Sequence, residues 1–237
     1  MCKGERRHIM ATHSVDNLQN KNICDLPPVV AEALEQEAVT TTYPTGAVLF
    51  AEGQVPRGIF VVRRGRVKLS ICGSDGMTLI LRMVEAGDPL GVAAVVSGRQ
   101  YEATAETQEP GEISFLRQSD LLRLMRLHGD LALWVTQHIS QDYASTCREI
   151  RDLILSDSAS EKLARLLVGW LDQNSASNHP SQMKLVLTHE EIGQMIGTSR
   201  ETVSRLFAGF KKQRLIQQSG STLVIPNRLA LESLIAV

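Results

Sequence analysis

The sequence lacks several features that mark large classes of proteins. No apolar run approaches the about 18 residues of a membrane-spanning helix. The basic residues within MCKGERRHIMATH are followed by no apolar stretch, so we expect no secretory signal. The P-loop, G-x-S-x-G and H-E-x-x-H motifs are also missing. We therefore expect a cytoplasmic protein with no membrane partner and no catalytic residues.

Cysteine is scarce and scattered. The four cysteines are far apart in the sequence and form no C-x-x-C pair; they are Cys2, Cys24, Cys72 and Cys147. This spacing favours structural thiols in a reducing compartment over a disulfide framework. It also gives no ligand set for a metal, so we expect none.

Excess charge of one sign is absent as well. The net charge of −1 gives no sign of a nucleic-acid partner for the whole chain. From Met183 to Val237, however, there are seven Lys or Arg and four Asp or Glu, a net charge of +3, so the preceding residues carry −4. A basic C-terminal segment on an acidic body fits a DNA-binding domain.

From Thr42 to about Arg117 the sequence has a period of two with frequent glycines. Val67, Leu69 and Ile71 alternate with polar residues, which predicts a half-buried strand. Turns are expected at Gly65 and within GSDG, residues 73–76, where a positive φ is needed. Strand-length segments separated by such turns predict an antiparallel β-barrel or β-roll.

The pattern changes near Ser119. After a break at His128-Gly129 we expect a long helix from about Asp130 to Leu155. Its spacings of three and four form a heptad-like seam, as in a helix that pairs with its copy, although an ordinary amphipathic helix packed on its own domain is the alternative. The seam consists of Thr136, Ile139, Tyr143, Thr146, Ile150 and Leu153.

The segment SDSAS, residues 156–160, predicts a polar hinge, and a helix from Glu161 to about Asp172 follows it. The segment QNSASNHPSQ then has the composition of a loop. Next, LTHEEIGQMIGTSRETVSRLFAGFKKQ contains two T-x-x-E capping boxes, Thr188 with Glu191 and Thr198 with Glu201. Gly197 lies between them, so two short helices joined by a glycine turn are expected.

The second of these helices has two distinct faces. Its apolar residues Val203, Leu206, Phe207 and Phe210 occupy one side, and the polar residues occupy the other. Two short helices with an exposed polar face on the second predict a helix-turn-helix. RLIQQSGSTLVIPN, residues 214–227, predicts two strands that form a wing. A solvated helix with a fortuitous Glu–Arg pair is the alternative.

The exposed residue types are those that contact DNA. Arginine suits a bidentate contact with guanine, glutamate accepts from cytosine, and serine serves either role. Threonines at helix N-termini can contact phosphate, and basic residues such as Lys211 extend the positive charge. We predict these DNA contacts: Thr188, Thr198, Ser199, Arg200, Glu201, Ser204, Arg205 and Lys211.

From about Leu26 onward the chain resembles the Crp/Fnr family of bacterial transcription regulators. The resemblance rests on YPTGAVLFAEGQVPRGIFVVRRGRVKLS, on GDPLG and on THEEIGQMIGTSRETVSRLF. It implies an α+β protein with an antiparallel, cyclic-nucleotide-binding-like β-roll, a long dimerisation helix and a C-terminal winged helix-turn-helix. It also implies a homodimer that binds near-palindromic double-stranded DNA, with RNA polymerase as a further partner. The matching of Arg200, Glu201 and Arg205 implies TGA-containing half-sites.

The implied division of the chain is an N-terminal tail over 1–25, a sensor domain over 26–127, the helix over 128–155 and the DNA-binding domain over 156–237. A cyclic-nucleotide-type module that controls an attached enzyme or channel is the rival interpretation. It is disfavoured because the last residues form a DNA-binding unit.

The residues that would hold cyclic AMP are replaced. Relatives that bind cyclic nucleotides carry a glutamate for the ribose after G-x-x-G and an Arg-Ser/Thr pair for the phosphate. Here Val92 takes the first position and Tyr101-Glu102 take the others. A carboxylate facing a phosphate is repulsive, and burying an unpaired phosphate is costly. We therefore expect no cyclic AMP held in the usual way, with Arg99 as the one nearby cation for a phosphate.

Other family cofactors are disfavoured too. An iron–sulfur cluster needs four converging thiolates, and only Cys24 resembles one of the family's ligands. No histidine lies in a haem-binding pattern. Two possibilities remain for the β-roll. An unidentified ligand binds there and shifts the paired long helices of the dimer, or the pocket is empty and the protein binds DNA constitutively. The expected effector pocket is lined by Arg82, Val92, Arg99, Tyr101, Glu102, Thr104, Thr146 and Cys147.

Overall fold

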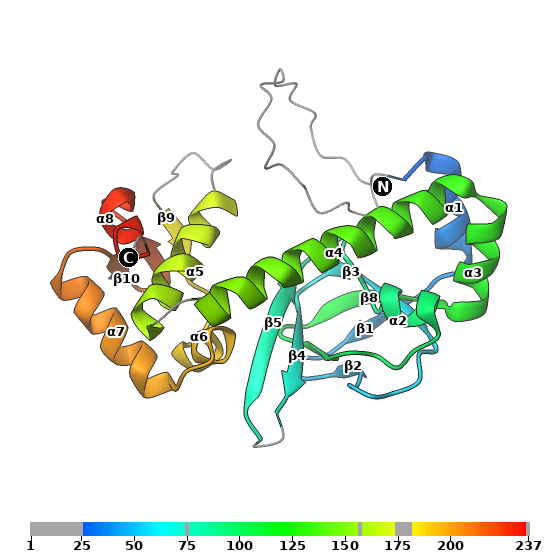
Figure 1. Ribbon diagram of the computed structural model, residues 1–237. Helices are drawn as coiled ribbons and strands as arrows, with labels where there is room; N and C mark the ends of the chain where they lie inside the picture. The colour runs from blue at the N-terminus through cyan, green and yellow to red at the C-terminus, as the bar shows by residue number, and fades with distance from the viewer. Residues whose placement is uncertain (1–25, 74–75, 156–157, 174–181, 236–237) are drawn as a thin grey trace, which may run out of the picture.

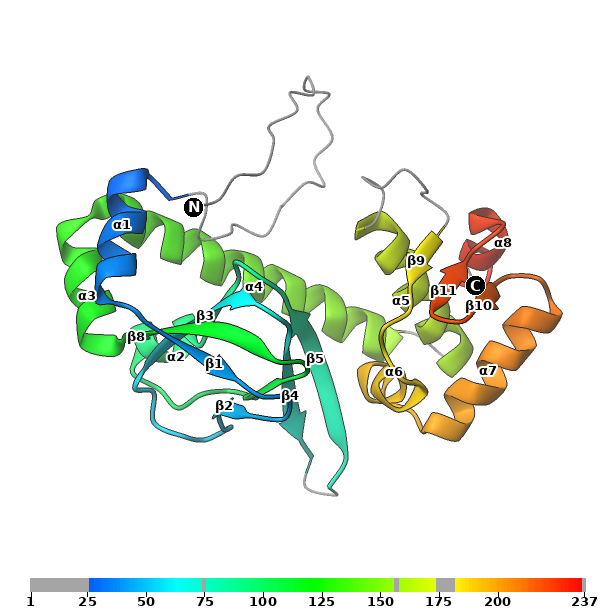
Figure 2. The same cartoon turned by 180° about the vertical axis from the view of Figure 1, so that it is seen from behind.

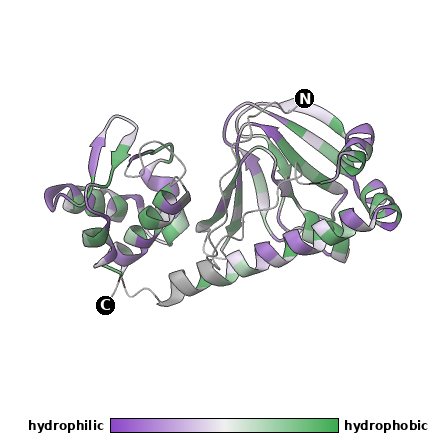
Figure 3. Ribbon diagram, turned by 90° about the horizontal axis from the view of Figure 1, so that it is seen from above, coloured by the Kyte–Doolittle hydropathy of each residue, from purple (hydrophilic) through white to green (hydrophobic). Residues whose placement is uncertain are grey.

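The computed structural model describes residues 26–73, 76–155, 158–173 and 182–235. A β-roll and a smaller C-terminal domain are joined by the long helix α4 (Gly129–Leu155) (Figure 1). Seen from above, the β-roll lies along one side of α4 only (Figure 3). The predicted tail over 1–25 and most of the predicted loop after α5 lie outside the described residues, as does part of the predicted hinge.

The β-roll is built from two antiparallel four-stranded sheets, which confirms the predicted α+β class. One sheet has the order β1-β8-β3-β6 and the other β2-β7-β4-β5 (Figure 2). The strands are β1 (Val39–Tyr43), β2 (Val48–Phe50), β3 (Gly58–Arg64), β4 (Val67–Cys72), β5 (Thr78–Val84), β6 (Pro89–Leu90), β7 (Thr104–Thr107) and β8 (Gly111–Arg117).

Strand β4 departs from the simple alternation that its sequence predicts. Leu69 pairs with Arg82 and Ser70 pairs with Ile80, so Leu81 is an extra residue in β5 and forms a β-bulge there. In β4 itself Ser70 is buried, whereas Leu69 and Ile71 are half-buried. The expected turn before β4 is present, because Gly65 has a φ of 94°. The bulge interrupts β5, whereas β4 pairs with β7 in unbroken register from Val67 to Ser70.

Three helices close the end of the β-roll where α4 begins. They are α1 (Pro28–Glu37), α2 (Val92–Ser97) and α3 (Gln118–Leu127). One apolar cluster joins them to β3 and α4, and it includes Val30, Leu121 and Trp134. A second cluster fills the roll between the sheets and includes Phe50, Phe60 and Tyr101. The roll therefore has a packed interior of its own.

Helix α4 starts at the predicted break and ends at the predicted residue. Its first half packs on the β-roll through Leu131, Trp134 and Val135, each at most 5% exposed. Further along, Asp142 Oδ1 accepts a 2.9 Å hydrogen bond from Arg82 of β5. Along the predicted seam Ile139 is half-buried, the side chain of Leu153 lies outside the described residues, and the others are exposed: Thr136, Tyr143, Thr146 and Ile150.

The C-terminal domain contains the predicted helices and the predicted wing. The predicted helices are α5 (Ala159–Gln173), α6 (His189–Ile196) and α7 (Arg200–Lys212), and the wing consists of β10 (Gln217–Ser219) and β11 (Thr222–Val224). A short helix α8 (Arg228–Glu232) and a third strand, β9 (Gln182–Lys184), which pairs with β11, were not predicted. One apolar cluster holds them together, with Leu167, Ile192 and Phe207 almost fully buried. Helix α6 also packs beside β5 of the β-roll (Figures 1 and 2).

Candidate nucleic-acid interface

The turn between α6 and α7 is fixed by two glycines. Gly197 ends α6 with a φ of 65°, a conformation that other residues adopt at a cost. Gly193 allows the turn to come close, since a Cβ there would lie 2.6 Å from the carbonyl oxygen of Thr198. Thr198 N–H also donates to the Gly193 carbonyl over 2.8 Å. The angle between the two helices is therefore set by backbone contacts.

The predicted capping box of α6 is present. The Thr188 hydroxyl accepts from the backbone N–H of Glu191 over 3.2 Å, and the Glu191 carboxylate accepts from the backbone N–H of Thr188 over 2.7 Å. The predicted capping box at α7 is wrong. Helix α7 is capped by Ser199, whose hydroxyl accepts from the N–H of Thr202. The contact of Thr198 with Gly193 keeps Thr198 in the turn.

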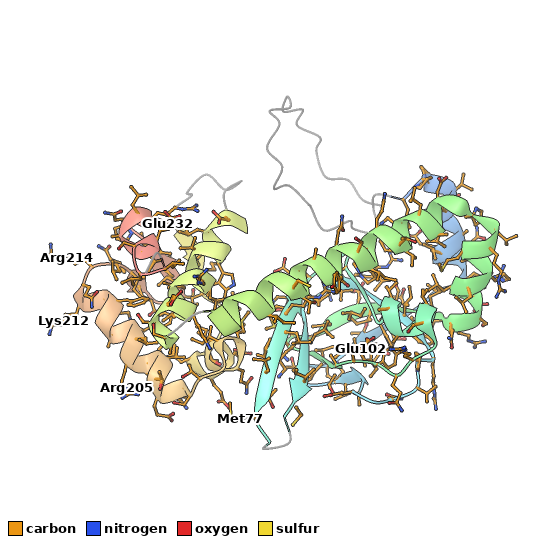
Figure 4. The ribbon with its side chains drawn as sticks, in the orientation of Figure 1. Met77, Glu102, Arg205, Lys212, Arg214 and Glu232 are labelled. Atoms are coloured by element: carbon orange, nitrogen blue, oxygen red, sulfur yellow. The ribbon has the colours of Figure 1, made fainter. Side chains whose placement is uncertain are left out.

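Helix α7 presents its polar residues to solvent. Its inner face consists of Val203, Phe207 and Phe210, which are at most 3% exposed. The other face is exposed and carries Arg200, Glu201, Ser204 and Arg205. Figure 4 shows Arg205, Lys212 and Arg214 projecting outward from the α7 side of the domain. The structure thus places the predicted base-contacting residues on one accessible surface.

Hydrogen bonds order the first turn of this surface. Thr202 Oγ1 accepts a 3.1 Å hydrogen bond from Arg205 Nη2 and lies 3.2 Å from Ser199 Oγ. Hydrogen bonds from its own backbone N–H and from Ser199 lower the pKa of Glu201, so that this carboxylate is charged at neutral pH. Thr202 was not among the predicted residues, although its spacing of three from both Ser199 and Arg205 makes it a neighbour of each on the helix.

The other predicted DNA contacts lie around this surface. Thr188 is exposed at the start of α6, and Thr198 is half-buried in the turn. Lys211 is exposed in the last turn of α7. The wing strands β10 and β11 follow α7 in the chain, so further exposed residues lie beyond the end of this helix. This arrangement suits phosphate contacts around a central set of base contacts.

The predicted effector residues lie in several parts of the β-roll and on α4. Arg82 contacts α4 through Asp142, and the Thr146 hydroxyl donates to the Asp142 carbonyl over 2.9 Å. Cys147 is exposed beyond them. Arg99 and Glu102 are exposed in the loop between α2 and β7, where they border an open recess.

The side chains of three predicted effector residues make contacts within the protein itself. They are Tyr101, Val92 and Thr104. Tyr101 is 3% exposed, its ring stacks on Phe50 at a centroid distance of 4.0 Å, and its hydroxyl donates to the carbonyl of Gly58. Burial raises the pKa of Tyr101. Val92 is buried in the apolar cluster under α2, and Thr104 Oγ1 accepts from the backbone N–H of Glu52 over 3.0 Å.

The residues present do not fit a cyclic nucleotide held in the family's usual way. A buried phosphate needs a cation or several donors. Tyr101 stands where the resemblance places the arginine, and its only polar atom already donates to Gly58. The next residue, Glu102, adds negative charge. Gly91 leaves space for the Tyr101 ring, because a Cβ on residue 91 would lie only 2.6 Å from that ring.

Two further findings concern the described residues alone. None of their helices is both long enough and apolar enough to cross a membrane. Among the same residues no three His, Cys, Asp or Glu side chains come together as a metal site would require.

Comparison with protein families gives matches for both domains. Residues 40–128 match the cyclic nucleotide-binding domain, and residues 161–234 match the Crp-like helix-turn-helix domain. The cAMP-activated global transcriptional regulator CRP of Haemophilus influenzae is 29% identical over 184 residues, covering 77% of this chain and 82% of that protein. The cAMP-activated regulator Vfr of Pseudomonas aeruginosa is 24% identical over 187 residues, covering 77% and 87%.

Solved structures share the fold across both domains. A CooA mutant from Carboxydothermus hydrogenoformans has a TM-score of 0.74 at 21% identity, covering 92% of this chain and 97% of that one. FixK2 from Bradyrhizobium japonicum has a TM-score of 0.73 at 23% identity, covering 84% and 98%. The two domain matches and the similarity to the CRP and Vfr regulators show that the chain is a non-enzymatic, DNA-binding transcription regulator and belongs to the Crp/Fnr family.

Proposed function

We propose that this regulator binds, as a homodimer, a near-palindromic operator with TGA-containing half-sites, and that it does so without cyclic AMP in the family's usual site. The observation that carries the proposal is the exposed polar face of α7. Arg200, Glu201 and Arg205 lie there with a hydrogen-bonded first turn. Rigid arginine and glutamate side chains in the first turns of such a helix can read base edges in the major groove.

Dimerisation is supported by the uncovered side of α4. Tyr143 is 73% exposed and Ile150 is 49% exposed, and their spacing of seven residues places both on the same side of the helix. Large apolar side chains repeated along one exposed helix face are typical of a surface that pairs with a copy. A two-fold dimer would present two α7 helices to half-sites about one helical turn apart. Such a dimer would act in the cytoplasm, with RNA polymerase as its partner at promoters.

Independence from cyclic AMP is supported by the residues inside the β-roll. Val92 and Tyr101 are both buried, and they stand at the positions that the family resemblance assigns to ribose and phosphate contacts. The relatives named above are described as cAMP-activated, so this chain would differ from them in its signal. The signal itself is left open by this proposal.

In-vitro selection of random duplex DNA by the purified, full-length protein tests the proposal. We expect a two-fold symmetric site with TGA in each half, and the same site and affinity when cyclic AMP is added. A single asymmetric site would contradict the dimer, and half-sites without TGA would contradict the assigned base contacts. An affinity that rises more than tenfold with cyclic AMP would contradict the proposed independence.

A further inference from the structure

One side chain outside the predicted contact set touches the base-contacting face. His189, the first residue of α6, places its ring nitrogen Nδ1 2.9 Å from the hydroxyl oxygen of Ser204. Ser204 is exposed one turn into α7, beside Arg205. A residue of the first helix therefore contacts a DNA-facing residue of the second helix.

The position of the His189 ring is restricted from two sides. The ring packs against Phe207 at a centroid distance of 4.7 Å and an interplanar angle of 32°. Phe207 is 1% exposed and belongs to the core of the domain. The capping box of Thr188 and Glu191 fixes the backbone on which His189 stands. The imidazole is thus held by packing, so its Nδ1 has a defined direction toward Ser204.

The charge environment keeps this imidazole neutral. Burial lowers the pKa of His189, and the nearby cations Lys211 and Arg200 lower it further. The positive end of the α6 dipole acts in the same direction, because His189 is in the first turn. A neutral imidazole has one nitrogen that donates and one that accepts. The tautomer therefore determines which hydrogen-bonding role Ser204 has left.

The two tautomers leave Ser204 with opposite roles. If Nδ1 accepts, the hydroxyl proton of Ser204 points to His189 and only oxygen lone pairs remain for a base amino group. If Nδ1 donates, the hydroxyl proton is free to donate to a base acceptor. An unrestrained serine can serve either role and so discriminates poorly between bases.

We propose that His189 is a positioning residue for base recognition: by its hydrogen bond to Ser204 Oγ it fixes the role of that hydroxyl and so determines the base that Ser204 selects. The inference rests on the proposed function, because it assumes that α7 reads bases. It adds a residue of α6 to the determinants of operator choice.

The test compares in-vitro selection and quantitative binding for four full-length proteins: the wild type, Ser204→Ala, His189→Phe and His189→Asn. The position that Ser204 reads is defined as the base pair whose preference changes in Ser204→Ala. His189→Phe keeps a ring on Phe207 and removes Nδ1, so we expect about threefold to tenfold weaker discrimination at that base pair. His189→Asn restores a polar atom near the Nδ1 position and is expected to keep the preference.

Two further variants guard the interpretation. His189→Gln carries its amide further out, near the Nε2 position, and should relax the preference as His189→Phe does, which covers the case that His189→Phe does not fold. The double variant Ser204→Ala with His189→Phe should discriminate no worse at that base pair than Ser204→Ala alone. Lys211→Ala is the matched control, since losing a phosphate contact weakens binding to all sequences equally.

The outcomes are separable. Relaxed preference at the Ser204 base pair, with the other positions unchanged, supports the inference. An unchanged preference in His189→Phe and His189→Gln, or a uniform loss of affinity like that of Lys211→Ala, would overturn it while leaving the proposed function intact. A wild type that selects no motif would overturn both.

Discussion

Tyr101 in the β-roll and Arg205 on α7 both occupy positions that the family resemblance assigns to ligand contact, yet their surroundings are opposite. Tyr101 is stacked on Phe50, and its hydroxyl is used by the backbone of Gly58. Arg205 is exposed, and its Nη2 donates a hydrogen bond to the hydroxyl of Thr202. A buried polar group with its hydrogen bond made is part of the structure, whereas an exposed and oriented one is available to a partner. The comparison separates a region built for packing from one built for binding.

The largest expected effect is on stability and comes from removing the buried ring of Tyr101. Tyr101→Ala should lower the free energy of unfolding of the β-roll by about 3–5 kcal/mol, because it leaves a cavity beside Phe50. Denaturant unfolding followed by tryptophan fluorescence measures this, in a Trp170→Phe background where Trp134 reports on the roll. Tyr101→Phe is the control and should cost about 1 kcal/mol for the lost hydrogen bond. An unchanged stability of Tyr101→Ala would show that the ring is not packed as described.

The variant Arg205→Ala tests whether the exposed arginine of α7 contacts DNA. If Arg205 makes a bidentate contact with guanine, the variant loses about 1–3 kcal/mol of binding free energy and relaxes the preference at one base pair. Competition binding against operators substituted one base pair at a time measures both effects. Equal weakening on every operator would instead make Arg205 a phosphate contact.

A smaller effect is expected for Lys211→Ala at the edge of the same surface. Its expected role is a phosphate contact, so the slope of log affinity against log salt should become shallower by about 1, with no change of base preference. Binding titrations at several salt concentrations give the slope. A slope identical to that of the wild type would remove Lys211 from the DNA-contacting set.

The smallest expected effect is on stability and concerns the ion pair between Arg82 of β5 and Asp142 of α4. A double-mutant cycle of Arg82→Ala and Asp142→Ala should give a coupling free energy of about 0.2–1 kcal/mol, because this ion pair is partly exposed. Denaturant unfolding of the four proteins supplies the cycle. Coupling near zero would mean that the Arg82–Asp142 ion pair adds nothing measurable to stability.

Much of the fold followed from local patterns. The ends of α4, the helix pair around Gly197 and the wing were predicted because each depends on residues within a few positions of one another. Helix α2 was not predicted: its sequence VAAVVS is short and rich in β-branched valine, and its helical state depends on packing beneath α4. The β-bulge at Leu81 of β5 was missed for a related reason, since it is defined by pairing with β4.

In the candidate site, too, features set by neighbouring residues were predicted, and features set by distant contacts were not. The exposed face of α7 was predictable because helical periodicity alone sorts Arg200 from Val203. The choice of Ser199 over Thr198 as cap was not, because both residue types cap helices well and the contact of Thr198 with Gly193 decides. The burial of Tyr101 depends on Gly91 and Phe50, and Phe50 lies far from it in the sequence.

The packing of α6 beside β5 has a mechanical consequence. The C-terminal domain is joined to the rest of the molecule by the chain that follows α4, and it also rests against β5 at a second place. A domain held only by its linker can rotate about that linker, but the second contact, of α6 with β5, restricts this rotation. Any swing of α7 relative to the β-roll therefore requires α6 to leave β5. Substitutions in that strand would change how freely the DNA-binding helices move while leaving every DNA-facing residue in place.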